Sequence, residues 1–399
     1  MLSRETIFTI VTRFVVLITN FVLVMLSTHF WGDEGRGLIA LIIADISIIV
    51  ILNNVSSGGT LAFHTPKFDR DKIFSVAYPG ALLTTIAGAI IFSFIQGFDY
   101  FQYLFVIALL ISFATTTSFY WLGKKNIKLY NLFTLLPPVL ILAFLMILYF
   151  PLGKTGVEVF FYAYYLSYGS VWIIGLISIF NKSRFRFRFD TKISKSIIIY
   201  GFKSELSYFI QFLNYRLSYY FISAWLGLAL LGIFSVAIAI TEAVWVVSKS
   251  ISAIHYSNVI NTENQVERIR LTEKAALNSF AVSLLALIVL FFIPEGVFTF
   301  VFGDDFAGVK TLTLYLFPGI IAVAVSNIYG HYFSGIGKMR VLIIKSSIGL
   351  AATAVFLFLL LKRYELTGAC ITLDIAYIVS SVYLYFMFHQ EKKKILRRA

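Results

Sequence analysis

The sequence has almost no cysteine and little charge. Cys370 is the only cysteine among the 399 residues, so an intrachain disulfide and a cysteine-based metal site are both excluded. The five histidines are scattered without ligand spacing, and no zinc motif is present. Charged residues make up 13%, about half the share of an average soluble domain. The composition therefore excludes an ordinary soluble protein.

Apolar residues dominate instead, at 59% of the chain. They gather into windows that are each near the length of a helix crossing the hydrocarbon core. The windows cover about 6–28, 37–56, 74–95, 101–121, 130–149, 157–180, 197–224, 229–250, 273–293, 311–333, 341–361 and 368–388. They predict an all-α polytopic membrane protein with about twelve transmembrane helices.

The net charge of +13 is explained by loops that keep lysine and arginine on the cytoplasmic side, so we expect no nucleic-acid partner. With a cytoplasmic N-terminus, most of the 33 basic residues fall in cytoplasmic loops. Outside the spans, the opposite face receives only Arg36, Lys154, Lys310, Lys362 and Arg363. This bias predicts an even number of spans with both termini in the cytoplasm.

A basic stretch divides the spans into six and six. It reads "NKSRFRFRFDTKISK" and covers 181–195. We therefore expect an N-terminal six-helix bundle over 1–181, a basic cytoplasmic linker over 182–195, and a C-terminal six-helix bundle over 196–399 with a short basic tail. The linker is held inside by its charge, and its composition also suits an anionic lipid surface.

The two halves resemble each other at an offset of 195. Gly32 then meets Gly227 and Gly37 meets Gly232, so "FWGDEGRGLIALIIA" overlays "WLGLALLGIFSVAIA". Both stretches predict a short outer turn into a second span. Ordered matches of this kind favour a duplicated six-helix unit, as in transporters built from internal repeats.

These paired turns, the "LNYRLSYYFISAWLG" helix, the "YFSGIGKMR" loop and the length of the chain resemble the O-antigen and polysaccharide flippase family. That family lies within the multidrug, oligosaccharidyl-lipid and polysaccharide exporter superfamily. The resemblance implies two six-helix bundles around a central cavity that opens alternately to either side. Where family members often carry an acidic residue after the arginine of the seventh helix, this chain has Leu217 and Ser218.

The resemblance also implies a function. A flippase of this family moves a polyprenyl-diphosphate-linked oligosaccharide from the inner to the outer leaflet of the bacterial cytoplasmic membrane, for surface polysaccharide biosynthesis. Its partners would be the lipid-linked oligosaccharide, membrane lipids and the polysaccharide polymerase machinery. The alternative is a multidrug exporter of the same superfamily that exchanges organic cations for protons or sodium.

Polar residues inside the spans are candidate functional residues, because charge at bilayer depth is costly. On the seventh span Gln211 and Asn214 belong to one polar stripe, whereas Arg216 lies on another face. On the first span Asn20 follows Arg13 by seven residues and shares its side. The candidate substrate-binding residues are Arg13, Asn20, Lys203, Gln211, Asn214 and Arg216.

Guanidinium groups would bind the diphosphate, because each can donate two parallel hydrogen bonds to one phosphate and keeps its positive charge. The sequence leaves open a structural alternative in which Arg13 pairs with Asp45, or Arg216 with Glu242, only to neutralise buried charge. Lys345 lies close enough to the cytoplasmic face to snorkel, and we assign it no role.

Buried carboxyl groups could bind or release a coupling proton, and the candidates are Asp45, Glu242 and Asp374. We expect no cofactor and no metal, with coupling to a proton or sodium gradient as an open alternative. The chain has no P-loop, metal motif or nucleophile arrangement, so we expect a transporter and not an enzyme.

Overall fold

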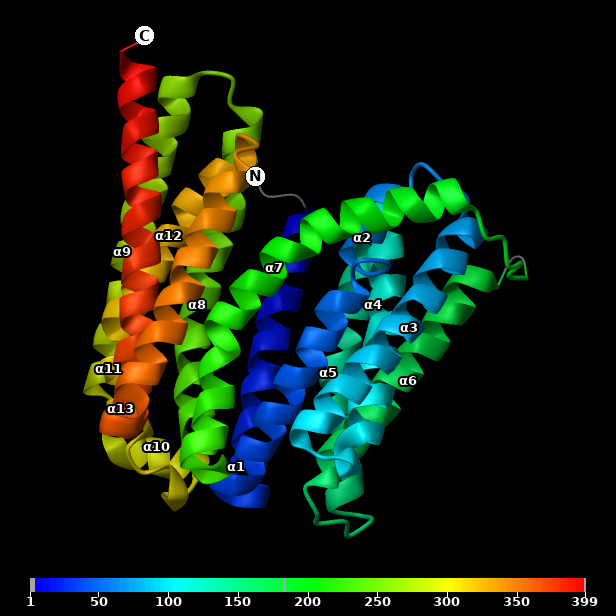
Figure 1. Cartoon of the computed structure of the whole chain (residues 1–399), viewed down its shortest axis with the longest axis horizontal. Helices are drawn as coiled ribbons and strands as arrows, with labels where there is room; N and C mark the ends of the chain where they lie inside the picture. The colour runs from blue at the N-terminus through cyan, green and yellow to red at the C-terminus, as the bar shows by residue number, and fades with distance from the viewer. Residues whose placement is uncertain (1–3, 182–183, 398–399) are drawn as a thin grey trace. The chain divides into compact units, whose positions relative to one another are not determined.

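The structure is a computed structural model that describes residues 4–181 and 184–397, and within these ranges it is helical and contains no strand (Figure 1). The longer helices are α1 (Arg4–Asn53), α3 (Arg70–Gln96), α4 (Phe101–Gly123), α5 (Ile127–Tyr149), α6 (Glu158–Phe180), α7 (Thr191–Leu226), α8 (Leu228–Asn261), α9 (Gln265–Phe292), α12 (Phe317–Gly335) and α13 (Met339–Leu396). Short helices connect them: α2 (Gly59–His64), α10 (Glu295–Phe302), α11 (Val309–Tyr315) and the 3-10 turns Phe98–Tyr100 and Asp304–Phe306.

Within the described residues, the long helices divide into twelve segments. Within the described residues eight helices are long and apolar enough, and the pair α11–α12, bent by 54°, makes nine. α1 and α13 each contain a break, at Gly32 and Glu365, which divides each of them in two and raises the count to eleven. α7 has 36 residues and is not counted among these apolar helices, because it carries the polar stripe. It is the twelfth long segment. The chain is an all-α polytopic membrane protein.

The two halves of the chain repeat the same backbone break. Gly32 interrupts α1 with φ 61° and ψ −162°, and Gly227 separates α7 from α8 with φ 93° and ψ 173°. Only glycine occupies this region readily, because a Cβ would clash with the backbone. The predicted equivalence of these two turns is confirmed.

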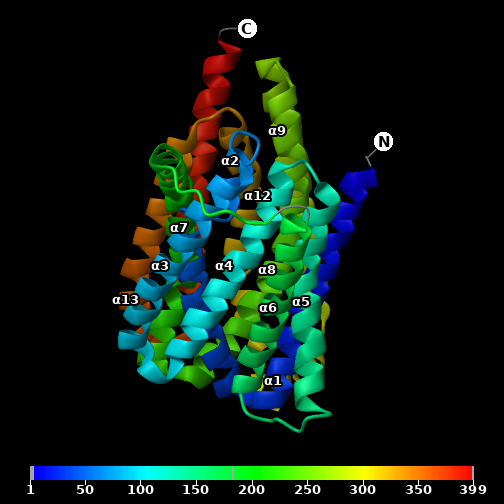
Figure 2. The same ribbon diagram turned by 90° about the vertical axis from the view of Figure 1, so that its right-hand side faces the viewer.

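The chain divides into two compact units. Unit 1 comprises the chain up to Trp31 together with Ile39–Phe209, and unit 2 comprises Gly32–Leu38 and everything from Ile210 onward. α7 therefore begins in unit 1 and ends in unit 2. Its first half runs across the end of unit 1 at a steep angle to α3 and α6 (Figures 1 and 2).

A buried polar hub lies in unit 1. The Nδ2 atom of Asn53, at the end of α1, donates to Thr85 Oγ1 at 2.8 Å and to Ser112 Oγ at 2.7 Å. Its Oδ1 atom accepts from Thr84. The side chain of Asn53 is fully buried, so these bonds satisfy an amide that would otherwise be costly to bury. The hub joins α1 to α3 and α4.

Candidate functional site

A cavity of about 380 Å³ lies inside unit 1. Four helices line it: α1 with Val16 and Asn20, α4 with Ala114, Thr115, Ser118 and Phe119, α5 with Tyr130, Phe133, Thr134, Pro137, Pro138 and Ile141, and α6 with Tyr164 and Tyr168. Hydroxyl groups and aromatic rings thus surround the cavity, which has the size of an ordinary small-molecule site.

Arg13 lies on the cavity side of α1. It precedes the cavity-lining residues Val16 and Asn20 by three and seven positions, which is the spacing of one helix face. The side chains of Arg13 and Asn20 are both exposed. One turn earlier, Thr9 Oγ1 accepts a hydrogen bond of 2.8 Å from Asn131 Nδ2, which ties α1 to α5. A cation therefore lies about one helical turn from Val16, the nearest cavity-lining residue of α1.

Arg13 and Asp45 do not form the structural pair that the sequence left open. Asp45 is fully buried, whereas Arg13 is exposed. Within the described part of the chain, Arg13 has no ion pair. Its guanidinium remains available to a ligand.

Arg216 and Glu242 do form a pair, in unit 2. The Nη2 atom of Arg216 lies 2.8 Å from Glu242 Oε1, and the guanidinium lies over the Tyr219 ring at 4.9 Å. The side chains are 21% and 36% exposed, so neither is fully enclosed. The Nη1 atom is buried and has no hydrogen-bond partner among the described residues. Glu242 therefore neutralises Arg216 but leaves part of its hydrogen-bonding capacity unused.

Three aromatic rings pack together beside this pair. Tyr215, Trp245 and Tyr377 form a closed triangle with centroid distances of 5.4, 5.7 and 5.8 Å. Gln211 Nε2 donates to the Tyr215 hydroxyl at 2.8 Å. Gln211 therefore orients a ring of the triangle, one helical turn away.

Asn214 holds α7 to α13. Its Oδ1 atom accepts from Thr353 Oγ1 at 2.8 Å, and a Cβ on Gly349 would come within 2.7 Å of its Nδ2 atom. The side chain is 1% exposed. This close contact gives Asn214 a packing role. Lys203, by contrast, is exposed on the first half of α7, in unit 1.

Asp374 caps the start of α12. Its Oδ1 atom accepts from the Gly319 backbone N–H at 2.9 Å, where the span bends between α11 and α12. The first N–H groups of a helix lack intrahelical partners, and a carboxylate there satisfies one of them. Asp374 therefore stabilises the bent span.

The linker docks onto α3, which the sequence did not indicate. Arg186 N donates to Asp71 Oδ2 at 3.2 Å, and Arg188 N donates to Ser75 Oγ at 2.8 Å. Lys72 Nζ lies 3.0 Å from Asp190 Oδ2, and this hydrogen bond lowers the pKa of Asp190. Asp71 and Ser75 of α3 thus fix the backbone of a basic segment.

Lys345 is buried and does not snorkel as expected. It is 7% exposed on the first half of α13, and no acidic partner is found for it among the described residues. Its position near the cytoplasmic end of the predicted span suggested snorkelling. The structure shows that the face of α13 that carries Lys345 is covered by protein.

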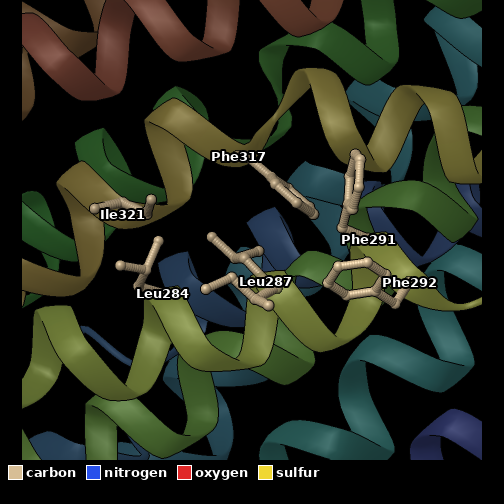
Figure 3. Close-up of a pocket in the computed structure, with 7 residues that line it drawn as sticks. Leu284, Leu287, Phe291, Phe292, Phe317 and Ile321 are labelled. Carbon is tan, nitrogen blue, oxygen red and sulfur yellow. The ribbon is translucent and has the colours of Figure 1, made fainter.

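A second hollow of about 230 Å³ lies between α9 and α12 in unit 2, and it is apolar throughout (Figure 3). Its lining consists of Leu284, Leu287, Ile288, Phe291, Phe292, Phe317 and Ile321. Such a lining suits hydrocarbon and offers nothing to a charged head group.

The fold is that of transporters of known structure. The chain superposes over its whole length on the inward-facing conformation of a multidrug resistance MATE family transporter of the MOP superfamily, with a TM-score of 0.75, 16% identity and 96% of that chain covered. For the MATE multidrug transporter DinF-BH, the TM-score is 0.69 at 16% identity, over 96% of this chain and 94% of that one.

A third match is a MOP superfamily transporter from Pyrococcus furiosus, described as having a binding pocket of reverse polarity that suggests a different function. Its TM-score is 0.65 at 15% identity, over 98% of this chain and 94% of that one. The TM-scores establish a shared fold, and at these identities the matches show the fold alone.

Sequence comparison adds one curated relative, the capsular polysaccharide biosynthesis protein CapF of Staphylococcus aureus. It is 24% identical over 161 residues, or 40% of this chain. The match covers 41% of the relative's length. No family model matches the chain.

Proposed function

We propose that this chain, which has the MATE fold, is an alternating-access transporter of the MOP superfamily. Its cargo would be a polyprenyl-diphosphate-linked oligosaccharide, carried from the inner to the outer leaflet of a bacterial cytoplasmic membrane with both termini in the cytoplasm. The protein performs no covalent chemistry and needs no cofactor; the polysaccharide polymerase machinery receives the product.

The observation that carries this proposal is the sign of the accessible charge inside the spans. Among the described candidates, Arg13 is exposed and unpaired, and Arg216 is partly exposed with a buried Nη1 donor that has no partner. The carboxylates are less available, because Asp45 is fully buried, Glu242 is bound to Arg216 and Asp374 caps α12. A diphosphate fits such a distribution, since guanidinium groups bind phosphate through two parallel donors.

The lining of the unit 1 cavity supports a sugar as the other part of the cargo. Thr115, Ser118 and Thr134 present hydroxyl groups, and Tyr130 and Tyr168 present rings. Hydroxyl groups both donate and accept hydrogen bonds, as sugar hydroxyls do. During transfer, the hydroxyl groups of the lining replace water as hydrogen-bond partners of the head group. The polar atoms of the head group are then not left without partners in hydrocarbon. The lipid tail stays in the bilayer.

An inside-negative membrane potential favours outward movement of net negative charge by about 2.3 kcal/mol per charge per 100 mV. Coupling to a proton or sodium gradient would add to this, and Asp45, Glu242 and Asp374 are the candidate residues. Transfer measured under an imposed proton gradient and an imposed sodium gradient separates the two.

The second candidate function is multidrug export. The solved transporters with this fold include multidrug transporters, and one observation in this chain favours the same activity. The triangle of Tyr215, Trp245 and Tyr377 beside Glu242 could receive an organic cation, because aromatic faces attract cations. The CapF relative favours the polysaccharide role but matches only part of each chain.

The test is leaflet transfer of a fluorescent polyprenyl-diphosphate oligosaccharide in proteoliposomes. Arg13→Gln should lower the rate by about tenfold or more, because a hydrogen bond to a charged group contributes about 1.5–3 kcal/mol. Arg363→Gln is the matched control, since Arg363 is also exposed but lies beside the break in α13. Equal rates in wild type and Arg13→Gln would remove Arg13 from the site.

For Arg216 the double variant Arg216→Gln with Glu242→Gln separates binding from charge neutralisation. Transfer that recovers in the double variant but not in Arg216→Gln assigns the arginine a structural role. Transfer lost in both assigns it to the cargo. If wild type moves no lipid-linked sugar yet extrudes a cationic dye, multidrug export is the function.

A further inference from the structure

The linker and the first half of α7 form a surface that is both basic and aromatic. We call residues 184–208 the basic–aromatic surface. Its exposed apolar side chains include Phe185 (40%), Phe187 (63%), Phe189 (59%), Ile198 (45%), Ile199 (46%) and Phe202 (61%). Its exposed basic side chains are Arg184, Arg186, Arg188, Lys192, Lys195 and Lys203.

The exposed apolar side chains are not those that pack α7 onto unit 1. That role belongs to Ile193 and Ile197, which join a buried cluster with Val76. Gly201 continues the same face, because a Cβ there would lie 1.9 Å from the carbonyl oxygen of Val55. The helix is therefore covered on one side by protein and carries exposed apolar side chains, Ile198, Ile199 and Phe202, on another side.

The linker part of the surface is held in place by its backbone. The N–H groups of Arg186 and Arg188 are bonded to α3. Since the main chain supplies these anchors, the Arg186 side chain and Phe187 remain exposed. The alternation of arginine and phenylalanine is thus displayed on a fixed segment.

The surface has no free negative charge among its described residues. Asp190 is paired with Lys72, and Glu205 is 7% exposed. A basic helix with exposed apolar residues, lying across the end of a bundle of spans, has the properties of a segment that rests in the interfacial plane of a membrane. Basic groups there are attracted by the negative potential of anionic phospholipids.

We propose that the basic–aromatic surface docks on anionic phospholipids of the cytoplasmic leaflet, with its phenylalanines and isoleucines among the upper acyl chains and its basic groups on the phosphates. α7 continues from this surface into unit 2. Anionic lipid therefore acts on the helix that joins the two units. This inference does not depend on the identity of the cargo.

The test uses full-length protein carrying Phe187→Cys, labelled with an environment-sensitive fluorophore and reconstituted in vesicles of phosphatidylcholine with or without phosphatidylglycerol. Cys370 is fully buried, so the folded protein is labelled at position 187 alone. Glu263→Cys, in the exposed loop between α8 and α9, is the control. Quenching by brominated lipid reports depth.

In vesicles that contain phosphatidylglycerol, we expect the emission of the label at position 187 to be blue-shifted and to be quenched by brominated phosphatidylcholine. The label at position 263 should show neither effect. The triple variant combines Arg184→Gln, Arg186→Gln and Lys195→Gln. In it, the ratio of membrane-docked to undocked surface should fall about fivefold for each charge removed. Arg188 and Lys72 are left unchanged because they form ion pairs with Asp69 and Asp190, respectively. High salt should act in the same direction.

The proposal would be overturned if the label at position 187 had, in both kinds of vesicle, the emission maximum of a fluorophore exposed to water. Equal quenching with and without phosphatidylglycerol would overturn the anionic part of it, as would full quenching in the triple variant. Gel filtration and thermal midpoints of every variant establish that each protein is folded.

Discussion

Two glycines make a backbone crossing in unit 2 that tolerates no side chain. A Cβ on Gly37 would lie 1.9 Å from the carbonyl oxygen of Leu228, and one on Gly232 would lie 2.0 Å from that of Asp33. The contact joins the segment that follows the break in α1 to the first turns of α8. The two glycines are also equivalent in the internal repeat, so the crossing is nearly symmetric.

Gly37→Ala and Gly232→Ala should each destabilise unit 2. To admit a methyl group the two segments must move apart until the distance from the new Cβ to the carbonyl oxygen grows from 1.9 or 2.0 Å to an ordinary contact of at least 3.4 Å. Adding atoms to a packed contact costs about 1–3 kcal/mol. The hydrogen bond of 3.1 Å from Arg36 Nε to Ser235 Oγ spans the same crossing and would be stretched.

The buried thiol of Cys370 supplies the assay. It is the only cysteine, is fully buried and belongs to unit 2. A maleimide dye that fluoresces on reaction therefore reports the unfolding of this unit on heating. For a unit of this size, about 1–3 kcal/mol lowers the midpoint by about 2–12 °C.

Gly296→Ala is the matched control, because no heavy atom lies within 4 Å of its Cβ position on α10. Alanine there should leave the midpoint unchanged or raise it slightly. The double variant Gly37→Ala with Gly232→Ala should cost less than the sum of the single variants, since one separation relieves both clashes. Unchanged midpoints in both single variants would refute the close crossing.

Three further predictions concern strain, the polar hub and the linker. Glu365→Gly should raise the thermal midpoint of unit 2, because Glu365 has φ 47° and ψ −132° and such strain costs about 1–3 kcal/mol in a residue with a Cβ; an unchanged midpoint would mean the strain is not present. Asn53→Leu should lower the free energy of unfolding by about 1–3 kcal/mol, as measured by calorimetry, because it removes the buried hydrogen bonds from the amide to Thr85 and Ser112. The pKa of Asp190 is lowered by Lys72, so its stabilisation of the linker is present above the ordinary aspartate pKa of about 4 and is lost as the pH falls through the lowered value. Deuterium exchange of amides 184–190, corrected for the intrinsic rate, should therefore accelerate at acid pH, and a pH-independent corrected rate would contradict this.

Much of the fold could be predicted from the sequence because it depends on local signals. Apolar windows of membrane-spanning length indicated the helices, and the glycine matches located two equivalent breaks at Gly32 and Gly227. The polar stripe of α7 was also visible.

The candidate site could be predicted only in part. Helical spacing placed Arg13 and Asn20 on one face, and the cavity of unit 1 lies along that face. Asn214 belonged to the same stripe as Gln211, yet its side chain is used to hold α7 to α13. Spacing along one helix says which residues share a face, but it does not say what lies opposite that face.

The sequence by itself determined the class of protein, the number of spans, the repeated glycine breaks and the excess of basic charge, because composition and periodicity carry all of these. Only the tertiary structure decided that Arg216 pairs with Glu242 while Arg13 stays free, and that Lys345 is buried. It also decided that the basic linker is fastened to α3. The physical reason is that an ion pair or a buried face requires two segments far apart in the chain to meet, and the choice of partner follows from the packing of whole helices.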